Sequence, residues 1–217
     1  MKKQNLALFD KVYTNTEMYY GWQLRNEFTE IVKNMDLTGK TVLDIGCGEG
    51  RYSIYLSEHG SKVTSVDASP VALKKLTLIA NERNLSIIPV VLDLKKYSFV
   101  KNAFDIVVAA TILDHLSDSI RHKIATGIME TLKTGGILYA NAFTTLDPGY
   151  EASLKQSKYE NLSISDTAMC IEHYFEPNEL HNLFSDLKIL SYYEGLEPDL
   201  SHGNPHIHGW ASLIARK

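Results

Sequence analysis

Three glycines at alternate positions, with an acid ahead of them, are the residues of this chain that most directly suggest chemistry. Gly46, Gly48 and Gly50 follow the apolar run of residues 42–45, which contains Asp44. Glycine has no Cβ and tolerates positive φ, so such a turn lets backbone approach a ligand closely. The spacing differs from the G-x-G-x-x-G of dinucleotide sites, and an acid here would repel a pyrophosphate. The turn therefore favours a ligand with an ammonium or hydroxyl groups, unless it merely joins a strand to a helix.

A second acid, Asp67, ends the next expected strand, residues 62–67. In a parallel sheet this position lies beside the glycine turn, where a carboxylate can accept hydrogen bonds from both hydroxyls of a ribose. Asp67 follows Gly46 by 21 residues, which matches the spacing of adenosine sites. The alternative is an acid that only caps a loop.

A sheet is needed to bring these acids together, and the sequence has the pattern of a chain that forms one. Short apolar, β-branched runs alternate with helical patterns, which indicates βαβ units. Pro89 suits an edge strand. We therefore predict an α/β fold, with a doubly wound, mostly parallel sheet and an antiparallel final strand. The expected strands cover residues 42–45, 62–67, 87–92, 104–110, 137–143, 187–193 and 210–215.

The stretch VLDIGCGEGRYSIYLSEHG, residues 42–60, resembles the first motif of class I S-adenosylmethionine-dependent methyltransferases. The resemblance extends from about Gly39 to Phe143. It implies a seven-stranded, Rossmann-like sheet with S-adenosylmethionine as cofactor. It also implies that the glycine turn holds the methionine end of the cofactor. Asp44 would then lie near its ammonium, Arg51 would reach its carboxylate, and Asp67 would bind the ribose.

Four further cofactor contacts follow from the resemblance. Asp93, which ends the third strand, is expected to accept from the adenine amino group, and the amide of Leu94 to meet the ring. Thr111, where the fourth strand ends, and Tyr20, from an aromatic N-terminal flap, complete the set. The alternatives are that Asp93 is a plain strand-end acid and that the N-terminal helix, expected at residues 16–35, only covers one edge of the sheet.

The expected activity is methyl transfer to a small-molecule acceptor. The sulfonium makes its methyl group electrophilic, so the protein mainly aligns the acceptor and excludes water. A general base is needed only where the acceptor loses a proton. His115, His206 and His208 are the candidate catalytic residues, because imidazole titrates near neutral pH. The alternatives are a packed turn around His115 and a structural hairpin around the other two.

The loop at residues 201–209 holds three histidines, His202, His206 and His208. They could bind a metal, since residues two apart on an extended segment share a face. The sequence offers no obvious cysteine or carboxylate nearby to complete a ligand set, so no metal is expected. If the sixth strand runs parallel to the first, this loop falls on the ligand-binding side.

The composition of the chain argues against several other classes of protein. The chain has 217 residues, which is enough for one substantial core and short for two domains. Its net charge of −4 and the lack of basic runs disfavour nucleic acid as a partner. No apolar run is long enough to span a membrane, and two cysteines, Cys47 and Cys170, provide no disulfide framework. A cytoplasmic location fits best, and the oligomeric state is left open.

We predict a single methyltransferase domain over residues 1–217, with an N-terminal helical flap (1–40) and a lid inserted after strand five (144–176). The tail LIARK resembles tellurite-resistance and thiopurine-type small-molecule methyltransferases, although an oxyanion acceptor would favour an arginine clamp that the lid lacks. The chain also lacks the Asn/Asp-Pro-Pro-aromatic motif of relatives that methylate DNA or protein amides. The alternative functions are a catalytically silent nucleoside-binding protein and an NAD-dependent oxidoreductase.

Overall fold

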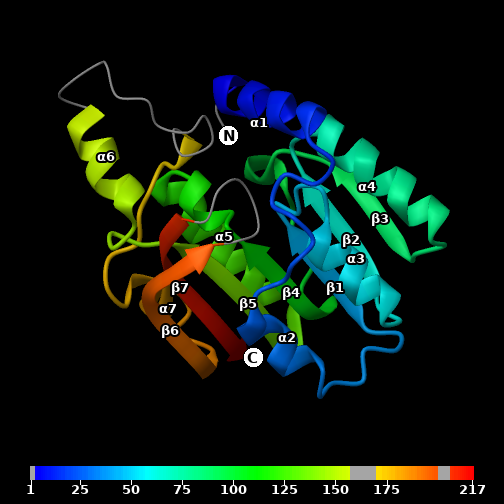
Figure 1. The fold of residues 1–217 in the computed structure, drawn as a ribbon. Coiled ribbons are helices and arrows are strands. Elements are labelled where there is room, and N and C mark those ends of the chain that lie inside the picture. The colour runs from blue at the N-terminus through cyan, green and yellow to red at the C-terminus, as the bar shows by residue number, and fades with distance from the viewer. Residues whose placement is uncertain (1–2, 157–169, 200–205) are drawn as a thin grey trace.

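The strands form one seven-stranded sheet with the order β3-β2-β1-β4-β5-β7-β6 (Figure 1). The computed structural model describes residues 3–156, 170–199 and 206–217, and all statements below concern these residues. The strands are β1 (Thr41–Ile45), β2 (Lys62–Asp67), β3 (Ile87–Val91), β4 (Phe104–Ala110), β5 (Leu132–Phe143), β6 (Lys188–Asp199) and β7 (His206–Arg216). The predicted fold class is confirmed.

Strand directions decide which side chains share an edge of the sheet. The pairs of β1 with β2 and β4, of β2 with β3, and of β4 with β5 are parallel. β7 is antiparallel to both β5 and β6. β6 therefore runs in the same direction as β1, and its carboxyl end lies at the same edge of the sheet as the glycine turn. Pro89 lies on the edge strand β3, as predicted.

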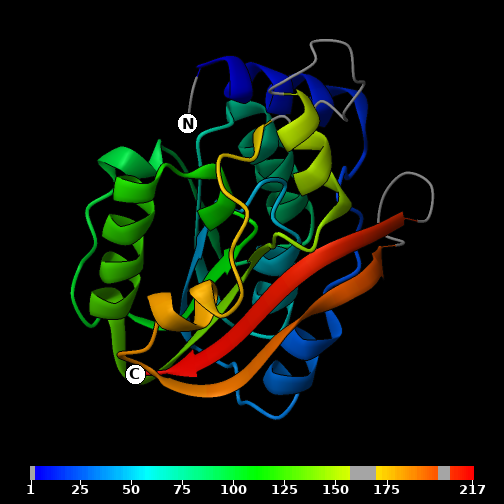
Figure 2. The same cartoon turned by 90° about the vertical axis from the view of Figure 1, so that its left-hand side faces the viewer.

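Helices cover both faces of the sheet (Figure 2). On one face α5 and α7 pack through Ile124, Ile128 and Leu180. On the other face α2 and α3 pack through Phe28 and Leu56. Each layer buries an apolar stripe against strands that are apolar on both faces. The helices are α1 (Lys3–Asn15), α2 (Asn26–Val32), α3 (Arg51–Glu58), α4 (Pro70–Glu82), α5 (Asp118–Thr131), α6 (Pro148–Gln156) and α7 (Glu179–Leu183), with short 3₁₀ turns η1 (Leu94–Lys96) and η2 (Leu113–His115).

The N-terminal part differs from the expected single helix at residues 16–35. It forms α1, an irregular segment, and the short helix α2. Gly21 has φ of 64°, which helical backbone does not adopt. α1 lies across the end of α4 in Figure 1, where Phe9 and Tyr13 pack with Ala72.

The C-terminal strands are longer than predicted. β6 continues to Asp199 and β7 begins at His206, so His206 and His208 belong to a strand and not to the expected loop. β5 begins at Leu132, five residues before the expected strand at residues 137–143. His202 lies outside the described residues.

The described part of the expected lid includes the helix α6. The last residues of the expected lid are hydrogen-bonded to the end of β5 and the residues after it. The Phe175 amide donates to the Phe143 carbonyl at 2.9 Å, and the Thr145 amide donates to the Phe175 carbonyl at 3.0 Å. Phe175 is fully buried. This end of the insertion therefore belongs to the packed structure, while residues 157–169 lie outside the described part.

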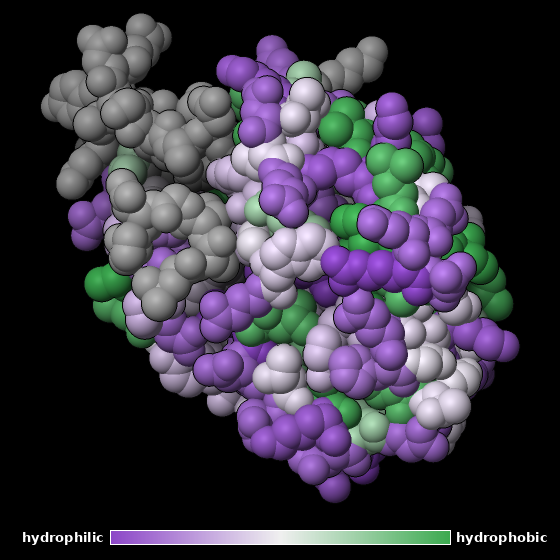
Figure 3. Space-filling model, turned by 45° about the vertical axis from the view of Figure 1, so that its right-hand side comes forward, coloured by the Kyte–Doolittle hydropathy of each residue, from purple (hydrophilic) through white to green (hydrophobic). Residues whose placement is uncertain are grey.

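Figure 3 brings the β3 side of the molecule forward and shows hydrophobic residues scattered among hydrophilic ones. Leu78, Ile88 and Val91 are among the exposed hydrophobic side chains. Pro89 removes one donor from the open edge of β3, which blunts its capacity to pair with another strand. In the described part of the chain, every helix is too short or too polar to cross a membrane.

Candidate functional site

The glycine turn adopts the backbone that its sequence predicts. Gly46, Gly48 and Gly50 have φ of 64°, 53° and 84°, a region that residues with a Cβ rarely adopt. The amides of Gly46 and Cys47 donate to the Val66 carbonyl, at 2.7 and 3.2 Å. The turn is thereby fixed to the end of β2, between β1 and α3.

The three glycines have different reasons to lack a side chain. A Cβ on Gly46 would lie 2.6 Å or less from Ile112 atoms, and one on Gly50 would lie 2.5 Å from Leu76. Because Gly46 and Gly50 lack a side chain, Ile112 and Leu76 can pack closely against the turn. A Cβ on Gly48 would instead lie 3.1 Å from the Tyr13 hydroxyl, a pocket-lining group. Within 4 Å, a Cβ on Gly48 would therefore meet only the end of the Tyr13 side chain, which belongs to the N-terminal segment.

Asp67 lies against the turn as predicted. Its Oδ2 accepts from the Gly48 amide at 2.9 Å, and its Oδ1 from the Ser69 amide at 2.8 Å. Each carboxylate oxygen has a second lone pair for a ligand hydroxyl. Burial raises the pKa of Asp67, although these amide hydrogen bonds counteract the shift. The carboxylate is thus held rigidly at the pocket wall.

Asp44 lies deeper, with 2% of its surface exposed. The Ser53 hydroxyl donates to it at 2.6 Å, and Ser53 also contacts the Ser65 hydroxyl at 2.7 Å. Burial raises the pKa of Asp44 to about 7; the Ser53 hydrogen bond lowers it and the nearby Asp67 raises it further. A cationic ligand group beside Asp44 would favour the ionised form.

The N-terminal segment closes the pocket on one side. Phe9, Tyr13, Met18 and Tyr20 line it. The contact of Tyr20 with the cofactor stays a prediction. The guanidinium of Arg51 donates to the Tyr20 and Gln23 carbonyls at 3.0 and 3.1 Å. Arg51 therefore holds this segment over the start of α3, and its contact with a cofactor carboxylate stays a prediction.

A buried ion pair that the sequence analysis missed fastens the same segment. Glu49, which is 4% exposed, pairs with Lys75 of α4 and accepts from the Tyr19 amide at 2.6 Å. The Lys75 ammonium also donates to the carbonyls of Tyr13 and Thr16, at 3.0 and 2.7 Å. The signal in the sequence was Glu49, the acid inside the glycine turn. Its partner Lys75 lies 26 residues further along the chain, on α4.

Thr111 lies at the end of β4 in a left-handed conformation, with φ of 49°. Its amide donates to the Asn141 carbonyl at 3.0 Å and to the Asn141 side-chain oxygen at 2.8 Å. Non-glycine residues in this region store backbone strain, which often accompanies functional sites. Thr111 lines the pocket, and its contact with the cofactor stays a prediction.

His115 is the candidate catalytic histidine that the structure places in this pocket. Its Nδ1 lies 2.9 Å from the Cys170 carbonyl, and its ring packs edge-on against Phe9. A carbonyl only accepts, so Nδ1 carries the proton of the neutral ring and Nε2 keeps its lone pair. His115 is 8% exposed, and so combines a packed ring with a place in the pocket wall.

Four predicted site residues lie away from the pocket lining. Asp93 caps η1 by accepting from the Lys95 amide at 3.1 Å, and Leu94 packs into the core. Their contacts with adenine stay a prediction. His206 and His208 form a pair at the carboxyl edge, on β7.

We expected no metal because no carboxylate was evident in the sequence to complete a ligand set with the histidines, and that reason was wrong. Asp199 places a carboxylate beside His206 and His208, and the candidate ligand atoms all lie within 4.8 Å of one another.

Comparisons with known proteins agree with this geometry. Residues 42–136 match the family described as methyltransferase domain. The chain is 32% identical over 124 residues to a ubiquinone biosynthesis O-methyltransferase of Coxiella burnetii, covering 57% of this chain and 51% of that protein. It is 29% identical over 180 residues to a probable S-adenosyl-L-methionine-dependent methyltransferase TehB of Haemophilus influenzae, covering 81% and 57%. The chain thus spans about half the length of the curated relatives it matches.

Solved structures extend the likeness over nearly the whole chain. The crystal structure of TehB from Haemophilus influenzae has a TM-score of 0.72 at 23% identity, covering 98% of this chain and 67% of that one. A Burkholderia thailandensis 1,6-didemethyltoxoflavin-N1-methyltransferase, crystallised with S-adenosylhomocysteine, has a TM-score of 0.63 at 18% identity, covering 88% and 77%.

Residues 42–136 are thus similar to a methyltransferase domain, and the fold is similar to that of solved methyltransferase structures, in agreement with the sequence resemblance. The chain resembles TehB in both sequence and fold.

Proposed function

We propose that this protein transfers a methyl group from S-adenosylmethionine to a small-molecule acceptor. The observation that carries the proposal is the pair of acids held by one glycine turn, with Asp67 on the Gly48 amide and Asp44 buried beside it. An amino-acid sulfonium joined to a nucleoside needs such a pair: one carboxylate for its ammonium and one for its ribose.

The residues present fit this cofactor. Gly48 lacks the Cβ that would intrude towards Tyr13, so that backbone can meet the ligand. Asp67 would hold the ribose hydroxyls, Asp44 the ammonium, and Tyr20 would cover the bound molecule. When bound, the cofactor supplies an electrophilic methyl group on a sulfonium. The chain's own task is to orient the acceptor and to keep water out.

His115 is the residue that we propose as general base for acceptors that must lose a proton. Its Nδ1 is held by the Cys170 carbonyl, so Nε2 is the atom left to accept one. Neither His206 nor His208 lines the pocket, which favours His115 over these two predicted candidates.

The test is turnover of isotope-labelled S-adenosylmethionine against a panel of phenols, thiols, amines and metalloid oxyanions, with both products identified by mass spectrometry. Labelled methyl in an acceptor and stoichiometric S-adenosylhomocysteine would support the proposal. Cofactor binding without transfer to any acceptor class would favour the silent nucleoside-binding alternative.

The role of His115 has a separate test. Replacing His115 with Ala should lower kcat/KM about 10²-fold or more for an acceptor that must lose a proton. A soft nucleophile that needs no base should be affected far less by the same change. The matched control is the exposed His122→Ala on α5, whose ring lies near Asp118. Equal losses with both kinds of acceptor would assign His115 a packing role.

A further inference from the structure

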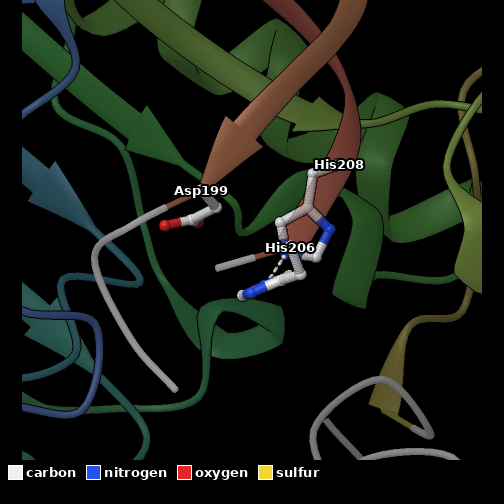
Figure 4. Close-up of side chains that lie close together, drawn as sticks. All are labelled: Asp199, His206 and His208. Atoms are coloured by element: carbon white, nitrogen blue, oxygen red, sulfur yellow. Dashed lines mark hydrogen bonds between the residues drawn. The ribbon is translucent and has the colours of Figure 1, made fainter. Parts of the chain in front are cut away.

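Two histidines and an aspartate converge where β6 ends and β7 begins (Figure 4). The side chains are Asp199, the last residue of β6, and His206 and His208 of β7. One nitrogen from each ring and one carboxylate oxygen lie within 4.8 Å of one another. All three residues are partly buried.

The register of the hairpin explains why these side chains meet. Asp199 is the direct cross-strand partner of His206, so both side chains leave the same face of the ribbon. His208 is two residues further along β7 and shares that face. The grouping therefore follows from the antiparallel ladder and does not depend on a chance side-chain rotamer.

A third carboxylate fixes the orientation of one imidazole. Nδ1 of His208 lies 2.8 Å from Oδ2 of Asp147, which is 5% exposed and also accepts from the Gly209 amide at 3.0 Å. A carboxylate accepts, so Nδ1 of His208 is the donor and its Nε2 presents a lone pair. A carboxylate behind a histidine in this way is the usual arrangement around metal-binding imidazoles.

The ring of His208 is also held by aromatic packing. Phe143 and Trp210 lie edge-on to it, with ring centroids at 4.9 and 5.3 Å. Fixing the ring lowers the conformational entropy that would be lost on binding a ligand at Nε2.

Nε2 of His208 and Nε2 of His206 lie 2.8 Å apart. At this distance one ring nitrogen donates its proton to the other, and a metal ion could replace that proton and bind both rings. The Asp199 carboxylate beside them adds negative charge, which favours the cation.

We propose that Asp199, His206 and His208 bind a divalent transition-metal ion, with Asp147 as the positioning carboxylate behind His208. Two imidazoles and one carboxylate suit Zn²⁺, Fe²⁺, Co²⁺ or Ni²⁺ better than Mg²⁺ or Ca²⁺, which prefer oxygen ligands. Three protein ligands leave at least one coordination position open. The proposal depends on the geometry of the β6–β7 hairpin and is independent of the proposed methyl transfer.

The experiment uses tag-free full-length protein, stripped with a chelator and then dialysed against metal-free buffer. Zn²⁺ is titrated calorimetrically, and Co²⁺ is followed by its visible absorption. We expect one ion per chain with a dissociation constant of about 1 µM or tighter. In a Trp22→Phe background, Ni²⁺ should quench the fluorescence of Trp210, which lies against the His208 ring.

Four variants locate the site. His206→Ala and Asp199→Asn should each weaken Zn²⁺ binding about 100-fold, and Asp147→Asn about 10- to 100-fold. The control His122→Ala should leave the affinity within about 3-fold, with circular dichroism confirming that every variant is folded. Absence of one-to-one binding to the wild type, or unchanged affinity in both His206→Ala and Asp199→Asn, would overturn the proposal and leave a proton-sharing imidazole pair.

Discussion

At the scale of single residues, the proposed contact between Asp44 and the cofactor ammonium implies that the protonation of Asp44 controls cofactor affinity. Burial raises its pKa to about 7, so without ligand the side chain is half protonated at neutral pH. Only the ionised form attracts an ammonium, and the neutral form must first lose its proton. Cofactor affinity should therefore increase as pH rises through this pKa and decrease below it.

We predict that affinity for S-adenosylhomocysteine rises about 5- to 10-fold between roughly pH 6 and pH 7.5, below the range where the ligand ammonium titrates. The measurement is calorimetry in two buffers of different ionisation heat, which should also reveal a proton released on binding. Asp44→Asn should bind more weakly, and its affinity should vary less with pH over this interval. Equal pH profiles for the two proteins would show that Asp44 does not contact the ammonium.

Gly48 provides the second prediction at this scale. Gly48→Ala should lower cofactor affinity about 10-fold or more, because the added methyl group enters the pocket on the side of Tyr13. Gly135→Ala is a matched control, since Gly135 also has positive φ, 79°, but a Cβ there would meet no atom within 4 Å. Both variants carry the same kind of backbone strain, so similar binding losses in thermally matched proteins would assign the effect to strain alone.

At the scale of elements, the end of α1 and the segment between α1 and α2 are fastened to the pocket by two cations. Lys75 ties Tyr13 and Thr16 to Glu49, and Arg51 ties Tyr20 and Gln23 to α3. Both cations bind backbone carbonyls, so they fix the path of the chain over the pocket.

Lys75→Met should destabilise the protein by about 2 kcal/mol or more, because Glu49 would remain buried without its partner. The loss should fall short of that for a fully buried pair, since the Lys75 side chain is 23% exposed. Adding Glu49→Gln should recover part of the loss in a double-mutant cycle followed by urea unfolding. Hydrogen exchange at residues 13–20 should quicken in Lys75→Met. Additive losses, with unchanged exchange, would show that the pair does not hold the segment.

Sequence patterns predicted some elements well and others poorly, for physical reasons. β1, β2, β3 and β4 were located to within about a residue, because the strands of this parallel sheet appear in the sequence as short apolar, β-branched runs. The extension of β6 through Glu197 and Pro198 was missed, because those residue types rarely form strands and only the long-range pairing with β7 makes them one.

At the scale of the whole molecule, the topology gathers all the candidate chemistry along one edge of the sheet. The glycine turn, Asp67, Thr111 and His115 follow strands that run in one direction, so their order in the sequence predicted a shared pocket. Contacts made by elements without periodic signals were not predictable in this way. Glu49 with Lys75, and Asp199 with His206, each join positions that only the folded chain brings together.

We propose that the pocket binds S-adenosylmethionine through Asp44 and Asp67, the two acids beside the glycine turn. The most direct test is calorimetric titration of S-adenosylhomocysteine into the wild type, Asp67→Ala and Asp105→Ala. Asp105 is a matched control, since it accepts from the Thr41 amide and from Lys133, at 2.9 and 2.8 Å, and does not line the pocket. Melting curves identify any variant that is unfolded.

The wild type should bind one S-adenosylhomocysteine per chain and should not bind NAD. Asp67→Ala should lose about 5- to 150-fold in affinity, the scale of two lost acceptor contacts, while Asp105→Ala keeps its affinity within about 3-fold. An absence of binding to the wild type, or the same dissociation constant in wild type and Asp67→Ala, would contradict the assignment of this pocket to the cofactor.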